Sequence, residues 1–191
     1  MRTYEYHRIK ELAQRLKEAG IDRRTIDQIM EGGEDIRRST KPEKKAEWMR
    51  GAMIGMNRLL DRQTRNRVRE ACACCLGGRR LKISRAIAQE NETLQNRIKA
   101  ANEASYVGSV SMGENGEILV RFAPEGLDRY RCVCLPRAQK PLPITYCYCC
   151  GGHVKHHLQI ALGRSLDCTV LSSALSSGGR RPCTFRFTIG V

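Results

Sequence analysis

The sequence predicts an α+β fold, in which a helical N-terminal half packs on an antiparallel sheet and one helix comes late in the chain. Two observations lead to this class. Apolar residues recur at helical spacing through the first hundred positions, and the spacing changes to strand-like alternation after Tyr106. Helices followed by strands are typical of α+β proteins. At 191 residues the chain suits one domain, or one domain with a helical extension.

Two short amphipathic helices are expected first. The apolar stripe of the first consists of Ile9, Leu12, Ala13 and Leu16. The stripe of the second, which begins at Asp22, consists of Ile26, Ile29 and Met30. Gly20 follows the first stripe and Gly32-Gly33 follows the second, and glycine is a common helix stop.

Longer helices are expected from residue 40 onward. Thr40-Lys41-Pro42-Glu43 has the spacing of a capping box with proline in the first turn. The stripe of this helix consists of Met49, Ala52, Met53, Met56 and Leu60. The next stripe, after Asp61, consists of Val68, Ala71, Cys72 and Cys75, and Gly77-Gly78 ends it. Two further helical pieces are expected at 81–88 and 94–101.

The second half predicts a sheet of four or five antiparallel strands. Asn115-Gly116 is a strong hairpin signal, and alternating apolar residues follow it. Strands are expected at 106–112, 117–122, 129–134, 166–171 and 183–189. The late helix, 153–162, follows a proline-containing loop.

Composition restricts the compartment and the use of the ten cysteines. The opening MRTYEYHRIK lacks the apolar segment of a secretory signal, and no stretch approaches the roughly 20 apolar residues of a membrane span. We therefore expect a cytoplasmic protein without a membrane partner. Thiols stay reduced in the cytoplasm, so the cysteines favour metal binding, redox chemistry or burial over a disulfide framework.

The net charge of +14 is spread along the chain. Residues 1–105 hold 24 Lys and Arg against 15 Asp and Glu, and residues 106–191 hold 10 against 5. A dedicated nucleic-acid binder more often concentrates its charge and interleaves it with aromatic residues, which are few here. We expect a solvated basic surface and only weak, non-specific contacts with DNA. A nucleic-acid-associated regulator is kept as an alternative.

Three groups of cysteines supply candidate metal ligands. Cys72-Ala-Cys74-Cys75 and Cys147-Tyr-Cys149-Cys150 each contain a C-x-x-C frame, whose spacing lets two thiolates reach one tetrahedral ion. Cys132 and Cys134 form a third pair, whose side chains would lie on the same face of a strand. The expected metal ligands are Cys72, Cys75, Cys132, Cys134, Cys147 and Cys150. The expected metal is zinc, with an iron-sulfur cluster as the alternative, because all-sulfur ligation suits both.

Packing is the competing explanation for several of these residues. Cys72 and Cys75 lie on an apolar helical stripe, and free cysteine is among the most buried residue types. Cys132 and Cys134 could form an inward strand face. Cys168 and Cys183 are isolated on expected strands, and we interpret them as core residues.

The stretch TYCYCCGGHVKHH also supplies candidate ligand-binding residues. We expect Cys149, His153 and His156 to face a bound small molecule, with Cys149 as the spare thiol beside the metal. His153 and His157 have the i, i+4 spacing of a shared metal ion, but no glutamate completes an H-E-x-x-H motif. For these histidines a solvated or pocket-lining role is favoured over metal ligation.

Several segments together resemble a family of cysteine-rich bacterial proteins of uncharacterised function. These are KAEWMRGAM, EACACCLGG, RCVC, TYCYCCGGHVKHHLQIALG and RRPCTFRFTI, within residues 44 to 189. The last two are also similar in layout to the vinyl-reductase-type small-molecule-binding domain and to thiazoline-carboxylate hydrolase-like proteins. The resemblance implies a pocket between sheet and helices and a cysteine-bound metal. It transfers no catalytic residue to this chain.

The sequence therefore favours binding over catalysis. We expect a helical extension, 1–40, and a cysteine-rich small-molecule and metal-binding domain, 41–191, with a small-molecule ligand and, as an open alternative, a homodimer. The competing hypothesis is a cysteine-dependent hydrolase of a small amide or thiazoline, with Cys149 as nucleophile and His153 or His156 as base. No obvious carboxylate is available to orient that base, because acidic residues are sparse in the second half.

Overall fold

The computed structural model describes residues 3–104 and 108–190. The elements in chain order are α1 (His7–Glu18), α2 (Arg23–Ile29), η1 (Gly33–Asp35), α3 (Pro42–Leu59), α4 (Arg62–Ala71), α5 (Gly78–Glu90), α6 (Leu94–Glu103), β1 (Ser109–Met112), β2 (Ile118–Arg121), η2 (Ile144–Cys147), α7 (Tyr148–Leu162), β3 (Leu166–Ser172) and β4 (Thr184–Ile189). Helices precede the strands except for α7, so the predicted α+β class is confirmed.

The four strands form one antiparallel sheet in the order β1-β2-β4-β3. The predicted hairpin is confirmed by the pairing of β1 with β2, although 106–107 of its first expected strand lie outside the described residues. Phe185 and Phe187 are fully buried on one face of β4, while Arg186 and Thr188 are exposed on the other. This alternation is typical of an antiparallel sheet with one covered face.

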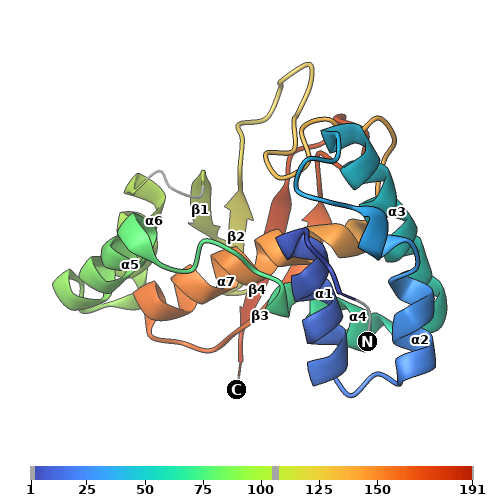
Figure 1. Ribbon diagram of the computed structural model, residues 1–191. Helices are drawn as coiled ribbons and strands as arrows, with labels where there is room; N and C mark the ends of the chain where they lie inside the picture. The colour runs from blue at the N-terminus through green and yellow to red at the C-terminus, as the bar shows by residue number, and fades with distance from the viewer. Residues whose placement is uncertain (1–2, 105–107, 191) are drawn as a thin grey trace.

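The strand expected at 129–134 is wrong. These residues belong to a long irregular segment, 122–143, which extends from the end of β2 (Figure 1). Both sides of β2 are already paired, with β1 and with β4, so the sheet offers no place beside it. The backbone N–H of Tyr130 instead donates to the carbonyl of Gly179, at 2.9 Å. The alternation in the sequence reflects partial burial of side chains and not a ladder.

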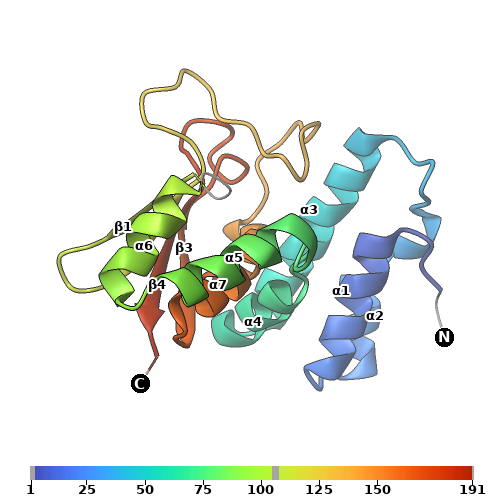
Figure 2. The same cartoon turned by 90° about the vertical axis from the view of Figure 1, so that its left-hand side faces the viewer.

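Helix α7 is the central helix and packs on β3, with α4, α5 and α6 beside it. Figure 2 shows α5 and α7 in front of β3 and β4. The helix begins at Tyr148, five residues before the expected start at His153, so Gly151 and Gly152 are helical and not a turn. Both are buried, since a Cβ on Gly151 would lie 2.6 Å from Cys168 Sγ and one on Gly152 would meet the carbonyl of Glu70.

The segment that links α4 to α5 also differs from expectation. Helix α4 ends at Ala71, with Cys72 as its C-cap, so the helical stripe predicted to include Cys75 is wrong there. Cys75 instead has a φ of +60°, in the left-handed region that helices exclude. Residues 72–77, the linking segment, cross α7 on the way to α5 (Figure 1).

Helix starts follow local capping chemistry in part. The Asp61 carboxylate accepts a hydrogen bond from the N–H of Thr64, as expected for an N-cap. The capping box predicted at Thr40 is wrong, because α3 begins at Pro42 and its N-cap is Lys41. Thr40 Oγ1 instead accepts from the N–H of Arg37, 2.8 Å away, and closes the preceding turn.

The described residues share one hydrophobic core. It contains Ile9, Leu12 and Leu16 of α1 together with Leu158 of α7 and Phe185 of β4. The division into 1–40 and 41–191 stays a prediction, but side chains from both parts meet in this core. No helix within 3–104 and 108–190 has the length and apolar character to cross a bilayer.

Candidate functional site

Four thiols from two distant segments meet beside the start of α7. Cys132 and Cys134 come from the segment 122–143, and Cys149 and Cys150 lie in the first turn of α7. The sulfur atoms of Cys134 and Cys150 are 3.7 Å apart. We call these four residues the thiol cluster. None of the ten cysteines, all of which lie in the described ranges, forms a disulfide in the structure.

The members of the cluster share protons unequally. Hydrogen bonding from Cys132 and Cys150 lowers the pKa of Cys134 far below that of an ordinary thiol, and Arg8 adds to the effect. Hydrogen bonding from Cys150 lowers the pKa of Cys149 to about 7, against the opposing effect of burial. The pKa values of the two donors, Cys132 and Cys150, are raised, because each holds its proton in the hydrogen bond to Cys134. Cys150 has one S–H and can donate to only one of these sulfurs at a time, so the cluster favours a thiolate at Cys134, and Cys149 is the second sulfur with a lowered pKa.

Two arginines lie against the cluster and share one tyrosine. Arg8 Nη1 of α1 donates to the carbonyl of Cys134 at 2.7 Å and to Tyr146 Oη at 3.3 Å. Arg69 of α4 is only 3% exposed, donates through Nη2 to the carbonyl of Tyr146 at 3.2 Å, and lies 4.9 Å from the centre of its ring. The two guanidinium groups thus hold Tyr146, which lies in η2, two residues before the start of α7.

The positive charge of Arg69 has no carboxylate partner in the described part of the chain. Its Nε is buried and makes no hydrogen bond there. Burial works to lower the pKa of Arg69, but its attraction to thiolates, that of Cys149 first, outweighs burial and the pKa is raised. A buried charge without compensation costs roughly several kcal/mol. Because no carboxylate of the described residues pairs with it, thiolates are the available counter-charge for Arg69. The fold thereby stabilises negative sulfur at this place.

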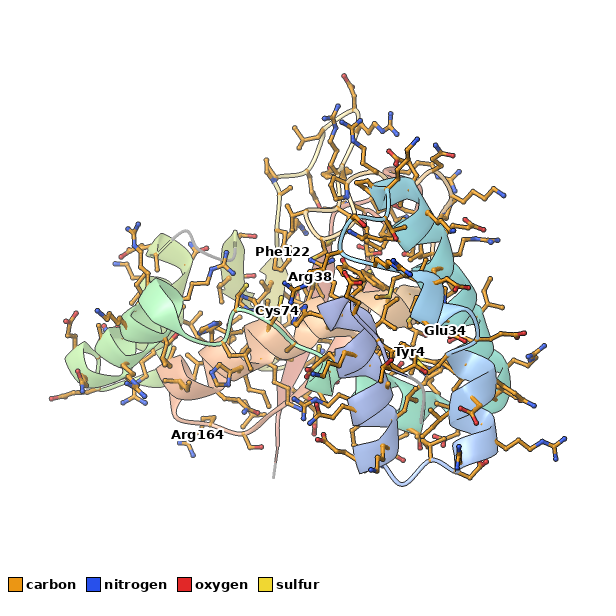
Figure 3. All side chains as sticks on the ribbon, in the orientation of Figure 1. Tyr4, Glu34, Arg38, Cys74, Phe122 and Arg164 are labelled. Atoms are coloured by element: carbon orange, nitrogen blue, oxygen red, sulfur yellow. The ribbon has the colours of Figure 1, made fainter. Side chains whose placement is uncertain are left out.

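Three histidines of α7 bind the linking segment by its backbone. His153 Nδ1 lies 2.7 Å from the carbonyl of Cys74, His157 Nε2 lies 3.1 Å from that of Cys75, and His156 Nε2 lies 3.1 Å from that of Leu76. A carbonyl only accepts, so each of these ring nitrogens carries the proton. Figure 3 labels Cys74 where the linking segment crosses α7. We call His153, His156 and His157 the carbonyl clamp.

The remaining ring nitrogens of the buried histidines are also engaged. Arg80 Nη1 of α5 donates to His153 Nε2 at 2.9 Å, and Ser84 Oγ lies 3.4 Å from His157 Nδ1. Burial lowers the pKa of both His153 and His157. Two of the residues expected to face a ligand, His153 and His156, therefore hold the protein's own backbone.

The structure gathers half of the six expected metal ligands. Cys132, Cys134 and Cys150 belong to the thiol cluster. Cys72 lies next to it at the end of α4, where the charge of Cys149 acts on its thiol, and Cys75 is exposed on the linking segment. Cys147 is buried, burial raises its pKa to about 12, and its thiol hydrogen-bonds to Ser173.

The geometry of a metal cage is not preformed. Within residues 3–104 and 108–190, no three His, Cys, Asp or Glu side chains are arranged so that they could hold a metal ion. Cys149, expected to be the spare thiol, is instead a full member of the cluster through Cys150.

The sequence did not predict Arg8 and Arg69, the residues that place positive charge beside the thiol cluster. Arginine is mostly a surface residue, and neither Arg8 nor Arg69 stands out from the 34 Lys and Arg of the chain. The one available signal was the position of Arg69 next to Val68 on the buried side of an amphipathic helix. Arg8 is separated from Cys134 by 126 residues, so only the tertiary fold brings them together.

Surface hollows lie away from the thiol cluster. One of about 540 Å³ is lined by residues of α2 and its end, including Arg23 and Asp27. Another of about 390 Å³ lies between α3 and the segment 122–143, and Glu47 and Leu142 line it. Neither includes a cysteine or histidine, so the expected pocket beside the cysteines stays a prediction.

Comparison with known proteins gives one match. The model of a family described as "Family of unknown function (DUF6144)" matches residues 3–189. No curated protein and no solved structure matches the chain. Function has therefore to be argued from the geometry of the site.

Proposed function

The chain belongs to the DUF6144 family of unknown function, and from its thiol cluster we propose that it carries out thiol–disulfide exchange. The observation that carries this proposal is the 3.7 Å separation of Cys134 Sγ and Cys150 Sγ. Two thiols at this distance lie in van der Waals contact, so a small side-chain rotation suffices to form a bond of about 2.05 Å between them.

The reaction needs one thiolate as nucleophile and a second thiol to release the product. The Cys134 thiolate attacks one sulfur of a disulfide, R–S–S–R, and forms a mixed disulfide while the first R–S⁻ leaves. Cys150 then loses its proton to solvent and attacks Cys134 Sγ, and the second R–S⁻ leaves. Starting from the Cys134 thiolate, the protein loses two electrons and one proton. The two R–S⁻ products take up that proton and one more from solvent, so the small-molecule disulfide is reduced to two thiols.

The surroundings support these roles. Cys134 has the lowered pKa that an attacking thiolate requires, with Arg8 as the neighbouring cation. Cys150 lies in the first turn of the 15-residue helix α7, where the helix dipole favours a developing thiolate. Cys134 keeps partial exposure, and its neighbour Val133 is 83% exposed, so a reagent can reach the segment.

The test is to oxidise the reduced protein with a small-molecule disulfide and map the product. We expect the loss of two hydrogen atoms and one peptide link between Cys134 and Cys150 by mass spectrometry. Cys150→Ser should stop at the mixed disulfide on Cys134, and Cys134→Ser should give neither product. Cys168→Ser, which removes a thiol outside the cluster, is the matched control and should behave as the unchanged protein. Oxidation confined to other cysteines would refute the proposal.

Zinc binding by the thiol cluster is a second candidate, favoured by two observations. Four thiolates around one zinc at about 2.3 Å would lie about 3.8 Å apart, close to the 3.7 Å between Cys134 and Cys150. Four thiolates and Zn²⁺ carry a net charge of −2, which Arg8 and Arg69 would offset. The ligands would then be Cys132, Cys134, Cys149 and Cys150, after rotation of their side chains toward a common centre.

Metal analysis of anaerobically purified protein tests this candidate. We expect about one zinc per chain if it holds, lost in Cys134→Ser and retained in Cys147→Ser, because the Cys147 thiol hydrogen-bonds to Ser173 and is not one of the four proposed ligands. An absorption spectrum distinguishes the iron-sulfur alternative. Protein purified without metal that also takes up no added zinc would exclude the candidate and leave thiol–disulfide exchange unaffected.

The hydrolase hypothesis has weaker support. Both ring nitrogens of His153 are engaged, by the carbonyl of Cys74 and by Arg80, so it is not poised to take a proton from Cys149. His156 donates through Nε2 to the carbonyl of Leu76 and makes no hydrogen bond to Cys149 among the described residues. The distant similarity to vinyl-reductase-type and thiazoline-carboxylate hydrolase-like proteins, the small-molecule ligand and the homodimer stay predictions, as does weak DNA binding.

A further inference from the structure

We propose that the thiol cluster prefers anionic disulfides as oxidants, and that Arg8 determines this preference. The inference rests on the proposed thiol–disulfide exchange and adds its substrate class: a disulfide that carries a carboxylate near the sulfur. It follows from the position of Arg8, from its unused donors and from the charge that is lost during the reaction.

Arg8 is placed beside the reacting sulfur and is incompletely used. Its Nη1 donates to the carbonyl of Cys134 at 2.7 Å and to Tyr146 Oη, which fixes the guanidinium next to that residue. Its Nε and Nη2 make no hydrogen bond to any residue that the structure describes, and the side chain is only half-buried. Two N–H donors of a guanidinium match the two oxygens of a carboxylate.

Cations dominate the charge around the cluster. Arg8 and Arg69 act on its thiols, and His153, itself bonded to Arg80, lies near Cys134. None of these three arginines forms an ion pair with a carboxylate within the described ranges. The carboxylate of Glu11 raises the pKa of Cys72, which is not a member of the cluster.

The reaction removes the negative charge that Arg8 faces. When Cys134 attacks, its thiolate becomes a neutral sulfur of the mixed disulfide, and the charge departs with R–S⁻. Arg8 then no longer faces a thiolate at Cys134. A carboxylate on the bound half of the disulfide would replace the lost charge, so an anionic reagent is stabilised most where the mixed disulfide forms. A cationic reagent would add a further positive charge to the same place.

Three aliphatic disulfides of different charge test this preference. The reduced protein is mixed with 3,3′-dithiodipropionate, bis(2-hydroxyethyl) disulfide or cystamine, and each rate constant is divided by that of the same reagent with the urea-denatured protein. We expect the normalised rate to be about tenfold higher for the anionic than for the neutral reagent, and lowest for cystamine. Raising the salt concentration should reduce the anionic advantage.

Variants assign the effect to Arg8. Arg8→Gln should bring the three normalised rates together, whereas Arg8→Lys should keep the order with a smaller spread. The control is Arg50→Gln on α3, which removes the same charge where the arginine pairs with Glu47, and it should retain the full preference. If Arg8→Gln does not fold, the salt dependence of the unchanged protein and the Arg8→Lys order still decide.

The outcomes separate this inference from the proposed function. If the Cys134–Cys150 disulfide forms at equal normalised rates with all three reagents, the charge preference is wrong and the exchange reaction stands. If no reagent yields that disulfide, the exchange itself is wrong. An anionic preference that survives unchanged in Arg8→Gln would overturn the role of Arg8.

Discussion

Single imidazole rings hold the linking segment in place, and His153 does so as a neutral donor, because its Nε2 accepts from Arg80. Protonation of His153 would turn Nε2 from an acceptor into a donor that faces the guanidinium of Arg80, so the hydrogen bond between them would be lost. Burial already lowers the pKa of His153 and of His157. The carbonyl clamp is therefore sensitive to acid.

The first prediction is a loss of stability on mild acidification. A histidine whose pKa is lower in the folded than in the unfolded protein stabilises the fold above about pH 6.5, the unfolded value, and loses this contribution as the pH falls below it. We expect the free energy of unfolding in urea to decrease between pH 7.5 and 5.5. A double variant, His153→Gln with His157→Gln, should show a weaker decrease, and the exposed His7→Gln should retain it. Equal slopes in all three proteins would contradict the prediction.

At this scale the sequence identified the cysteines but not their electrostatic partners. Spacing singled out Cys132, Cys134 and Cys150, because clustered thiols are rare in a reduced compartment without a use. It could not assign Arg8 or Arg69, since their role depends on contacts across 126 and 77 residues. Charged contacts between residues far apart in the chain leave no regular spacing in the sequence, so they cannot be predicted from it.

Helix α7 depends on two glycines that the sequence suggested were a turn. Gly-Gly is a common loop signal, yet here the missing side chains allow α7 to approach β3 and α4 closely. Cysteines 149 and 150 consequently sit on a helix and not on a flexible turn. The strand expected at 129–134 failed for a related reason: alternation reports which side chains are buried and does not report whether a neighbouring strand edge is free.

The second prediction concerns these close contacts. Gly152→Ala should destabilise the protein by about 1–3 kcal/mol, because its Cβ would overlap the backbone carbonyl of Glu70, which cannot move aside as a side chain can. The control is Gly51→Ala in α3, where nothing lies within 4 Å of the added Cβ. That change should stabilise by about 0.5–1 kcal/mol, as alanine is the better helix former. Thermal or urea unfolding measures both, and a neutral Gly152→Ala would show that α7 does not need this approach.

In the whole molecule, hydrophobic periodicity predicts the helices well, whereas the site depends on how the chain connects its elements. Helical periodicity was sufficient for α1 to α4, because each buries one stripe against the common core. The order β1-β2-β4-β3 was beyond reach, since β4 enters between β2 and β3 after a long interval of chain. The thiol cluster lies where the segment 122–143 meets the start of α7, so its composition follows from that arrangement.

The third prediction tests whether residues 1–40 are separable. Six buried core residues belong to this part: Ile9, Leu12, Leu16, Ile29, Met30 and Ile36. Their removal would expose the faces of α3 and α4 that they cover, at about 1.5–3 kcal/mol per buried side chain, which is comparable with the whole stability of a domain. A chain of residues 41–191 should therefore lose its cooperative thermal transition and bind a hydrophobic dye. An unchanged cooperative transition would establish 1–40 as an independent extension.

The carbonyl clamp has a consequence for how this family can diverge. His153, His156 and His157 recognise only main-chain oxygens of residues 74–76, which every amino acid possesses. Substitutions in the linking segment can thus leave these hydrogen bonds in place, except that the φ of +60° at Cys75 disfavours bulky and β-branched residues there, whereas a change in the imidazoles would remove the hydrogen bonds. The segment is free to acquire new side chains beside the thiol cluster while its course is inherited, and the surface next to the reactive sulfurs can evolve faster than the scaffold that supports it.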